Sequence, residues 1–383
     1  MDRLINQLPF FNPEHQNLAQ TVAQFVADEI EPRAAEREED VEGAARHFVS
    51  LLASTGLLKF AVADTKLDIR ALCLIREALA YSSSLADLAF VMQGLGTYAI
   101  SQAAPDHVRE FWLSRAANGK AIAAFALTEP EAGSDVAAIQ TTARRDGETY
   151  VIDGRKRFIS NAGIADFYTV FAKTGTRHDG LAALSAFVVG SKMQGFSVAQ
   201  RTPLMAPHPI GEIAFNGCRV PAEDMVGNEG DGFKLAMETL DTFRASVGAA
   251  ACGMARRALD EAVRYASARK QFGRFLAEHQ LVQAKLADMI TELDAARLLV
   301  YRAAYAKDTA ASRVTREASE AKLFATEAAG RIIDSAVQIH GGTGLVSGTV
   351  VERLYRDVRA LRIYEGTSEI QQLVIAGQLL KEH

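Results

Sequence analysis

The chain has 383 residues, of which 49% are hydrophobic and 23% are charged. A chain of this size can bury a large core and divide into two or three domains, and its composition excludes both a disordered chain and a small disulfide-stapled one. The 42 basic and 47 acidic residues give a formal charge of −5, and the sequence has no dense run of Lys and Arg. We therefore expect no nucleic-acid partner.

Cysteine usage and the N-terminal residues bear on the compartment. Cys73, Cys218 and Cys252 lie far apart and make neither a CxxC pair nor an even disulfide framework, which favours buried thiols in a reducing compartment. Residues 1–13 hold no long apolar segment, and no later stretch supplies the ~20 apolar residues of a membrane span. These features predict a cytoplasmic protein. No His, Cys and carboxylate cluster has metal-ligand spacing, so no metal is expected.

The first third of the chain has a helical pattern. Asn12 is a plausible N-cap with Pro13 at the first helical position, apolar residues recur at helical spacing as far as Ile30, and Pro32 closes the helix. Further helical stretches cover residues 71–80 and 88–99. Residues 1–118 are therefore predicted to form an N-terminal helical domain.

The middle of the chain changes to short β-rich runs. These are residues 149–152, 167–172 and 186–189, and the Asp153-Gly154 pair that follows the first run predicts a hairpin turn there. Residues 119–228 are predicted to form a small central β-barrel or β-sandwich domain.

The last part of the chain again predicts helices. No proline follows Pro221, and apolar residues from Val282 to Val300 repeat at the 3.6-residue period over about five turns. Residues 229–383 are therefore predicted to be a C-terminal four-helix-bundle domain. The expected fold class is α+β, mainly α, without the βαβ alternation of a doubly wound sheet.

Two segments of the β region have a pattern that could hold a planar cofactor. The loop at residues 125–135 follows an apolar run and contains Pro130 and a Gly-Ser-Asp turn, although such a turn is usually only a connection. Further along, Phe158 and Ser160 stand two residues apart, which places an aromatic ring and a hydroxyl on one face of a strand. Such a face could stack on an isoalloxazine ring and hydrogen-bond to it.

A third segment, near the C-terminus, offers a base. A Glu before a Gly is more often a solvated turn residue, but Glu365 follows Ile363 and Tyr364, and Thr367 or Ser368 can cap a following helix. A carboxylate at the mouth of an apolar pocket has a raised pKa and can act as a base near neutral pH.

These three segments, in this order and in a helix–β–helix layout, resemble the acyl-CoA dehydrogenase family across nearly the whole chain. The joint pattern is specific, whereas each further match is weak by itself. The further matches are Asp241 to Arg244, Arg269 to Gly273, His279-Gln280 and Gln338 to Gly344.

The resemblance implies FAD as cofactor and assigns residues to it. The flavin-ring contacts would be Phe125, Leu127, Thr128, Phe158 and Ser160. Contacts near the pyrophosphate and across a subunit boundary would be Gly133, Ser134, Arg269, Gln271, Phe272, His279, Gln280, Gln338, Ile339, His340, Gly341, Gly342, Thr367 and Glu369. An ordinary structural role is the alternative for some of the matched residues: Gly341 and Gly342 could be a helix C-cap, and Asp241 with Arg244 could be a surface ion pair.

The resemblance also implies a reaction, the α,β-desaturation of an acyl-CoA thioester. Glu365 would remove the α-proton while the β-hydride passes to flavin N5, and the Glu365 backbone N–H and a ribityl hydroxyl would polarise the thioester oxygen. Substrate contacts would come from Ser134, Asp241, Arg244, Tyr364 and Gly366. Phe243 stands where some relatives carry the glutamate, and Phe cannot take a proton.

Departures from the family pattern leave the substrate open. The connection at residues 62–68 is short, Phe158 replaces a more familiar Trp, and Gly377 stands where many relatives have an Arg. The resemblance implies an electron-transfer flavoprotein as acceptor and a homotetramer. An acyl-CoA oxidase or a dehydrogenase of carrier-protein-bound acyl groups is the alternative, and a catalytically silent flavoprotein associated with nucleic acid is a remote one.

Overall fold

The computed structural model describes residue 5 and residues 8–34, 40–62, 64, 66–176, 182–309 and 313–382. Internal contacts divide the chain into two compact units. The first comprises Met1–Glu38, Asp68–Asp87 and Asp241–His383, and the second comprises Glu39–Leu67 and Leu88–Leu240. Each unit is built from segments that are distant in sequence.

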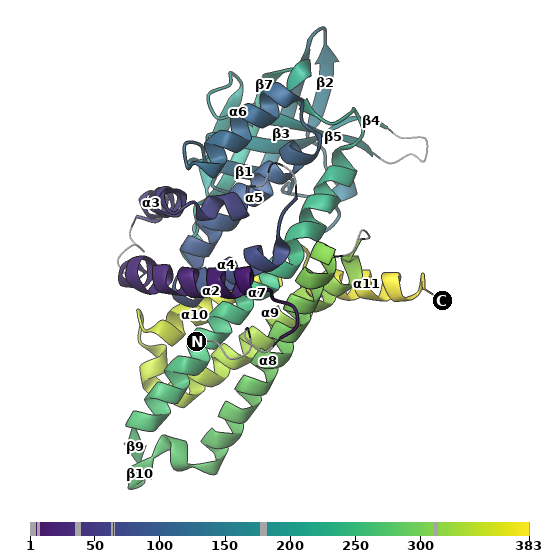
Figure 1. Cartoon of the computed structure of the whole chain (residues 1–383). Helices are drawn as coiled ribbons and strands as arrows, with labels where there is room; N and C mark the ends of the chain where they lie inside the picture. The colour runs from purple at the N-terminus through teal and green to yellow at the C-terminus, as the bar shows by residue number, and fades with distance from the viewer. Residues whose placement is uncertain are drawn as a thin grey trace. The chain divides into compact units, whose positions relative to one another are not determined.

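Helices make up the first unit (Figure 1). They are α2 (Pro13–Phe25), α4 (Ile69–Ser82), α8 (Gln280–Thr309), α9 (Thr315–His340), α10 (Val350–Val358) and α11 (Ser368–Leu379). A small hairpin of β9 (Lys270–Gln271) and β10 (Arg274–Phe275) precedes α8. Two helices contribute residues to both units, α5 (Ser84–Ala103) and α7 (Gly232–Ala268).

The predicted start of the first helix is confirmed. Asn12 caps α2 by accepting a hydrogen bond from the His15 N–H at 3.1 Å, and Pro13 is the first helical residue. Near the predicted end at Pro32, the helix passes into a π-helical turn (Val26–Ile30) and a 3-10 turn (Glu31–Arg33). The local capping signal therefore fixes the start of this element, whereas Pro32 lies inside the 3-10 turn that follows it.

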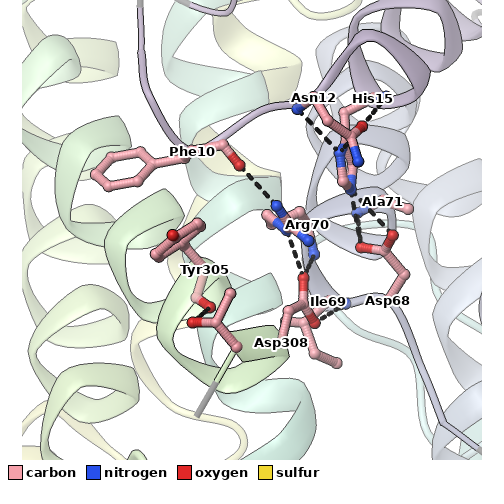
Figure 2. Close-up of polar contacts among 10 residues, drawn as sticks. Phe10, Asn12, His15, Asp68, Ile69, Arg70, Ala71, Tyr305 and Asp308 are labelled. Carbon is pink, nitrogen blue, oxygen red and sulfur yellow. Dashed lines mark hydrogen bonds and ion pairs between the residues drawn. The ribbon is translucent and has the colours of Figure 1, made fainter.

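A polar network anchors the start of α4 to α2 and α8 (Figure 2). The Asp308 carboxylate accepts hydrogen bonds from the backbone N–H of Ile69 at 2.8 Å and from Arg70 Nε at 2.7 Å. Asp68, the N-cap of α4, accepts from the Ala71 N–H and contacts buried His15 at 3.0 Å. These carboxylates satisfy the free N–H groups of the helix N-terminus.

Glycine allows α7 to pack closely on its neighbours. A Cβ atom at Gly253 would overlap the backbone carbonyl of Glu77 on α4, and one at Gly248 would lie 2.7 Å from the Val300 side chain on α8. Neither approach leaves room for a larger side chain. The predicted repeat along α8 is confirmed for its second half, where Met289, Leu293, Ala296 and Val300 are buried.

An eight-stranded sheet forms most of the second unit (Figure 1). Its order is β6-β7-β3-β2-β4-β5-β8, with β1 pairing in parallel with β4. The strands are β1 (Ala123–Ala126), β2 (Thr142–Asp146), β3 (Thr149–Ser160), β4 (Phe167–Thr176), β5 (Ala182–Gly190), β6 (Phe196–Arg201), β7 (Ile210–Pro221) and β8 (Met225–Val226). The unit also contains α3 (Val41–Ser54) and α6 (Asp106–Ala117).

The hairpin turn predicted at Asp153-Gly154 is wrong. Residues 153 and 154 lie inside β3, where the register with β7 shifts, and a Cβ atom at Gly154 would lie 2.6 Å from Thr141 Oγ1. The turn falls at Gly147, which has φ 62° and joins β2 to β3. Gly154 thus serves a β-bulge and a close backbone approach rather than a turn.

Buried polar groups join α5 to the start of the sheet. The Gln93 amide donates to the Ala121 carbonyl at 2.8 Å and accepts from the Ala123 N–H at 2.7 Å. The Thr169 hydroxyl donates to the Gly96 carbonyl at 2.7 Å. This fixes α5 against β1 and β4 and positions the loop that follows β1.

The predicted fold class is confirmed: a mainly helical N-terminal domain, a central sheet domain and a C-terminal helical domain. The boundaries at 118 and 228 stay a prediction. Of the described helices, none is long and apolar enough to cross a membrane. Within the short connection at residues 62–68, Ala63 and Thr65 lie outside the described residues.

Candidate active site

Glu365 lies in a strained turn between two helical segments. A 3-10 turn ends at Arg362 and α11 starts at Ser368, with Thr367 as N-cap accepting from the Ile370 N–H at 3.3 Å. Between them, Glu365 has φ 53° and Gly366 has φ 89°. A left-handed conformation is costly for a residue with a Cβ atom and persists only where the surroundings impose it.

Two buried side chains impose that conformation from other elements. Gln371 Nε2 on α11 donates to the Glu365 carbonyl at 3.1 Å and to the Gly366 carbonyl at 3.0 Å. Lys322 Nζ on α9 donates to the same Gly366 carbonyl at 2.7 Å. Both donor side chains are fully buried. The carbonyls of the turn are therefore held by three hydrogen bonds.

One oxygen of the Glu365 carboxylate is buried without a hydrogen-bond partner. This atom is Oε2, and it is buried although the residue as a whole is partly exposed. Burial raises the pKa of Glu365, and the positive charges of Arg76, Lys322 and Arg244 oppose that rise. The result is a carboxyl group whose pKa stands above its ordinary value, which suits a base that takes and returns protons near neutral pH.

A buried ion pair lies close to this turn. Arg76 on α4 donates through Nε and Nη2 to both oxygens of Asp87, each at 2.7 Å, and through Nη1 to Ser246 Oγ at 2.8 Å. The two side chains are 1% and 5% exposed. Burial raises the pKa of Tyr364, and the Arg76 guanidinium partly offsets that rise. The pair therefore adds charge beside both Tyr364 and Glu365.

Sequence patterns alone do not predict these supporting residues. Arg76, Asp87, Ser246 and Lys322 come from four different helices and belong to no shared motif. One signal is available, because the apolar run at residues 71–75 of α4 is followed by Arg76 and Glu77, and all seven residues are buried. A charge on a buried helix face requires a partner.

Asp241 and Arg244 form an ion pair, as their spacing allows, but not on the surface. Arg244 is 6% exposed and pairs with Asp241, whose carboxylate also accepts from Arg313 at 2.6 Å and from Thr315 at 2.9 Å. The Arg244 Nε atom is buried and has no partner. The surface interpretation is therefore wrong, and Phe243 between them is fully buried in the core.

In the second unit, the loop after β1 is fixed by a buried ion pair. Lys156 Nζ donates to Glu129 Oε1 at 2.8 Å and to the Leu127 carbonyl at 3.0 Å. Leu127 is buried in the core, whereas Phe125 and Thr128 are partly exposed. Gly133 and Ser134, further along the loop, are exposed. Because its side chain is buried, Leu127 can contact a cofactor only through its backbone groups.

The predicted aromatic and hydroxyl pair lies at a bulge in β3. Phe158 has φ 55° and is 48% exposed, while the intervening Ile159 is buried. The Arg157 guanidinium lies 4.9 Å from the Phe158 ring centroid. His208, which the sequence analysis did not identify, has its Nε2 atom 2.8 Å from Ser160 Oγ, and burial lowers the pKa of His208 to about 4.

A second set of predicted residues gathers around the β9–β10 hairpin at the end of α7 (Figure 1). Phe272 has φ 54° and is 95% exposed at the hairpin tip, and the His279 Nε2 atom lies 3.3 Å from the Gln271 carbonyl. Tyr265 stacks on His340 at 4.3 Å and connects α7 to the end of α9. Also exposed are Arg269, Gln280, Gln338, Gly341 and Gly342.

The remaining residues predicted to contact the cofactor differ in solvent exposure. Ile339 is 7% exposed, so its side chain belongs to the core. Thr367 uses its hydroxyl as the N-cap of α11, and Glu369 is exposed in the first turn of that helix. The structure therefore brings Tyr364, Glu365, Gly366 and Arg244 into one charged cluster, while the hairpin residues form a separate exposed group.

Each unit exposes an aromatic ring that a globular chain normally buries. In the second unit this ring is Phe158, and the Ser160 and Thr128 side chains add hydroxyl groups beside β3; in the first unit it is Phe272 at the hairpin tip. No group of three or more His, Cys, Asp or Glu within the described part of the chain could hold a metal ion. The exposed side chains named here offer aromatic stacking and hydrogen bonding.

Comparisons with known proteins identify the family of the chain. Models of the acyl-CoA dehydrogenase N-terminal, middle and C-terminal domains match residues 12–120, 124–218 and 230–380. A 3-(aryl)acrylate reductase of Clostridium sporogenes is 41% identical over 380 residues, covering 97% of this chain and 100% of the relative. A subunit of the caffeyl-CoA reductase-Etf complex of Acetobacterium woodii is 44% identical over 275 residues, 71% of this chain and 72% of that subunit.

A solved structure supports the same assignment over the full fold. Butyryl-CoA dehydrogenase from Megasphaera elsdenii superposes with a TM-score of 0.90 at 34% identity, covering 97% of this chain and 99% of that one. The match therefore includes the sheet domain and both helical domains. This chain belongs to the acyl-CoA dehydrogenase family, an FAD-dependent family of oxidoreductases.

Proposed function

We propose that the chain binds FAD and oxidises an acyl-CoA thioester between its α and β carbons, with Glu365 as the catalytic base. The observation that carries this proposal is the Glu365 carboxylate, which is held in a left-handed turn with one buried oxygen that has no partner. A carboxylate in that state has free capacity to accept a proton from a ligand.

Residues of the chain supply the polarising and positioning groups. The backbone N–H of Glu365 has no hydrogen-bond acceptor among the described residues, so it is available to a thioester oxygen. A donor aimed at that oxygen stabilises the negative charge that develops as the α-proton leaves. Tyr364 and Gly366 flank the carboxylate, and Arg244 and Asp241 add charge to the same cluster.

For FAD we propose the residues that the sequence pattern selected. When bound, the flavin supplies a two-electron acceptor for the β-hydride. Its ring contacts are proposed to be Phe125, Thr128, Phe158 and Ser160, with backbone groups at Leu127. Contacts to the remainder of the cofactor are proposed for Gly133, Ser134, Arg269, Gln271, Phe272, His279, Gln280, Gln338, His340, Gly341, Gly342, Thr367 and Glu369, with only backbone groups at Ile339.

A second function, reduction of an α,β-unsaturated thioester, is favoured by a specific comparison. The 3-(aryl)acrylate reductase matches 97% of this chain. The same carboxyl group can return a proton to the α carbon, since the forward and reverse reactions use the same groups. An electron-transfer flavoprotein as redox partner, a homotetramer and a cytoplasmic location are part of the proposal, as are domain boundaries at 118 and 228.

Anaerobic spectroscopy of the FAD-loaded protein tests both directions. Oxidised protein is mixed with a panel of saturated acyl-CoA thioesters, and reduced protein with the corresponding enoyl-CoA thioesters, while flavin absorbance is followed. We expect bleaching by at least one saturated thioester and a loss of at least ~10³-fold in its rate in Glu365→Gln. Protein that binds FAD but responds to no thioester in either direction would exclude the proposal. Reoxidation by O₂ against an electron-transfer flavoprotein separates oxidase from dehydrogenase.

A further inference from the structure

Three buried cations lower the pKa of Glu365, and they differ in whether an aspartate forms an ion pair with them. Arg76 and Arg244, which lower the pKa of Glu365, each have an aspartate of their own, Asp87 and Asp241. Lys322 has no carboxylate within ion-pair distance among the described residues, although its side chain is fully buried. A buried ammonium without a carboxylate in direct ion-pair contact is rare and expensive to desolvate.

We propose that Lys322 is a positioning residue whose ammonium both fixes the Glu365 turn and supplies the counter-charge that keeps the Glu365 carboxylate ionised in its buried site. The inference rests on the proposed role of Glu365 as base. It assigns to α9 a function in the active site that no motif near Glu365 indicates.

The hydrogen bond made by Lys322 is not sufficient reason for a buried charge. The Gly366 carbonyl already accepts from Gln371 Nε2 at 3.0 Å, and Lys322 Nζ adds a second donor at 2.7 Å. A neutral amide thus holds the same turn without the desolvation cost of an ammonium. The charge of Lys322 is therefore explained by its effect on the neighbouring carboxylate rather than by the turn alone.

Glu365 and Lys322 shift each other's pKa in the directions expected for opposite charges. Burial lowers the pKa of Lys322 to about 8, and the Glu365 carboxylate opposes that fall more than any other group. In the other direction, Lys322 follows Arg76 among the charges that hold down the raised pKa of Glu365. Each group therefore stabilises the charged form of the other.

Four helices contribute further charged side chains that act on Lys322 or Glu365. Asp87 on α5 raises the pKa of Glu365, and Arg244 on α7 acts against the charge of Lys322. Glu327 on α9 and Glu369 on α11 favour the charged Lys322 more weakly than Glu365 does. The carboxylate of Glu327 is already paired with Arg362 and Ser368, which leaves Glu365 as the main counter-ion.

The test compares two kinds of variant at the Gly366 carbonyl: those that remove the charge of Lys322 and one that removes the neutral donor of Gln371. Lys322→Met and Lys322→Gln remove the charge, Lys322→Arg keeps it, and Gln371→Met removes the neutral donor without changing charge. For each, the rate of flavin reduction by a thioester is measured from pH 5 to 9 in single turnover. The Glu365 carboxyl stretch is titrated separately by infrared difference spectroscopy against Glu365→Gln, which requires no turnover.

We expect the midpoint of the Glu365 titration to rise by at least about 1 pH unit in Lys322→Met and Lys322→Gln, as for removal of a close opposite charge. Lys322→Arg and Gln371→Met should keep the wild-type midpoint, although Gln371→Met slows the reaction by loosening the turn. Equal midpoints in all variants, or an equal shift in Gln371→Met, would overturn the assignment. If no thioester reduces the flavin, the proposed function fails, and the infrared titration still decides the role of Lys322.

Discussion

Removing Asp87 should destabilise the first unit strongly, because it leaves the buried Arg76 guanidinium without its ion-pair partner. Two of the three hydrogen bonds of the Arg76 guanidinium go to Asp87 at 2.7 Å, and only Ser246 remains as a partner. The guanidinium is 1% exposed, so water does not replace the lost carboxylate. Breaking a buried pair from one side typically costs about 3–5 kcal/mol.

Urea unfolding of Asp87→Ala, followed by circular dichroism at one protein concentration, measures this cost. The double variant Arg76→Met/Asp87→Leu is the matched control, because it removes both charges and refills the volume, and it should regain most of the lost stability. A cost below about 1 kcal/mol for Asp87→Ala would refute the reasoning, as would a double variant no more stable than the single one. Since Asp87 raises the pKa of Glu365, its removal should also lower that pKa.

Three further outcomes are expected. Gly366→Ala places a Cβ atom at φ 89° that overlaps Gln371 Nε2, so unfolding should show a loss of roughly 1–3 kcal/mol together with slower flavin reduction. Asp308→Ala leaves the backbone N–H groups of Ile69 and Arg70 and the Arg70 Nε atom without their acceptor, and thermal unfolding should show a loss of roughly 2–3 kcal/mol. Because the pKa of Glu365 is raised, bleaching by an acyl thioester should increase as pH rises through that pKa, and flavin reoxidation by an enoyl thioester should decrease.

Local signals predicted the elements that local chemistry determines. The Asn12 cap and the following proline place the start of α2, and the glycine and capping residues around Glu365 indicated a turn before a helix. The order of helical and β-rich segments gave the fold class. In each case the atoms that fix the element are within a few residues of one another in sequence.

Long-range packing decided the features that the sequence did not predict. Asp146-Gly147 and Asp153-Gly154 are the same dipeptide, and only contacts with other segments show that Gly147 makes the turn while Gly154 allows close approach to Thr141. The groups around Glu365 have the same origin, since Arg76 and Lys322 reach it from helices 289 and 43 residues away in sequence. His208 likewise meets Ser160 only because β3 and β7 pair.

Exchange of the substrate α-proton tests the central role of Glu365 most directly. An acyl-CoA thioester that bleaches the flavin is incubated with FAD-loaded protein in D₂O, and deuterium at the α carbon is followed by mass spectrometry. We predict exchange in the wild-type protein and a loss of at least ~10³-fold in the exchange rate in Glu365→Gln. Exchange at the wild-type rate in Glu365→Gln, with FAD bound, would show that another group removes the proton.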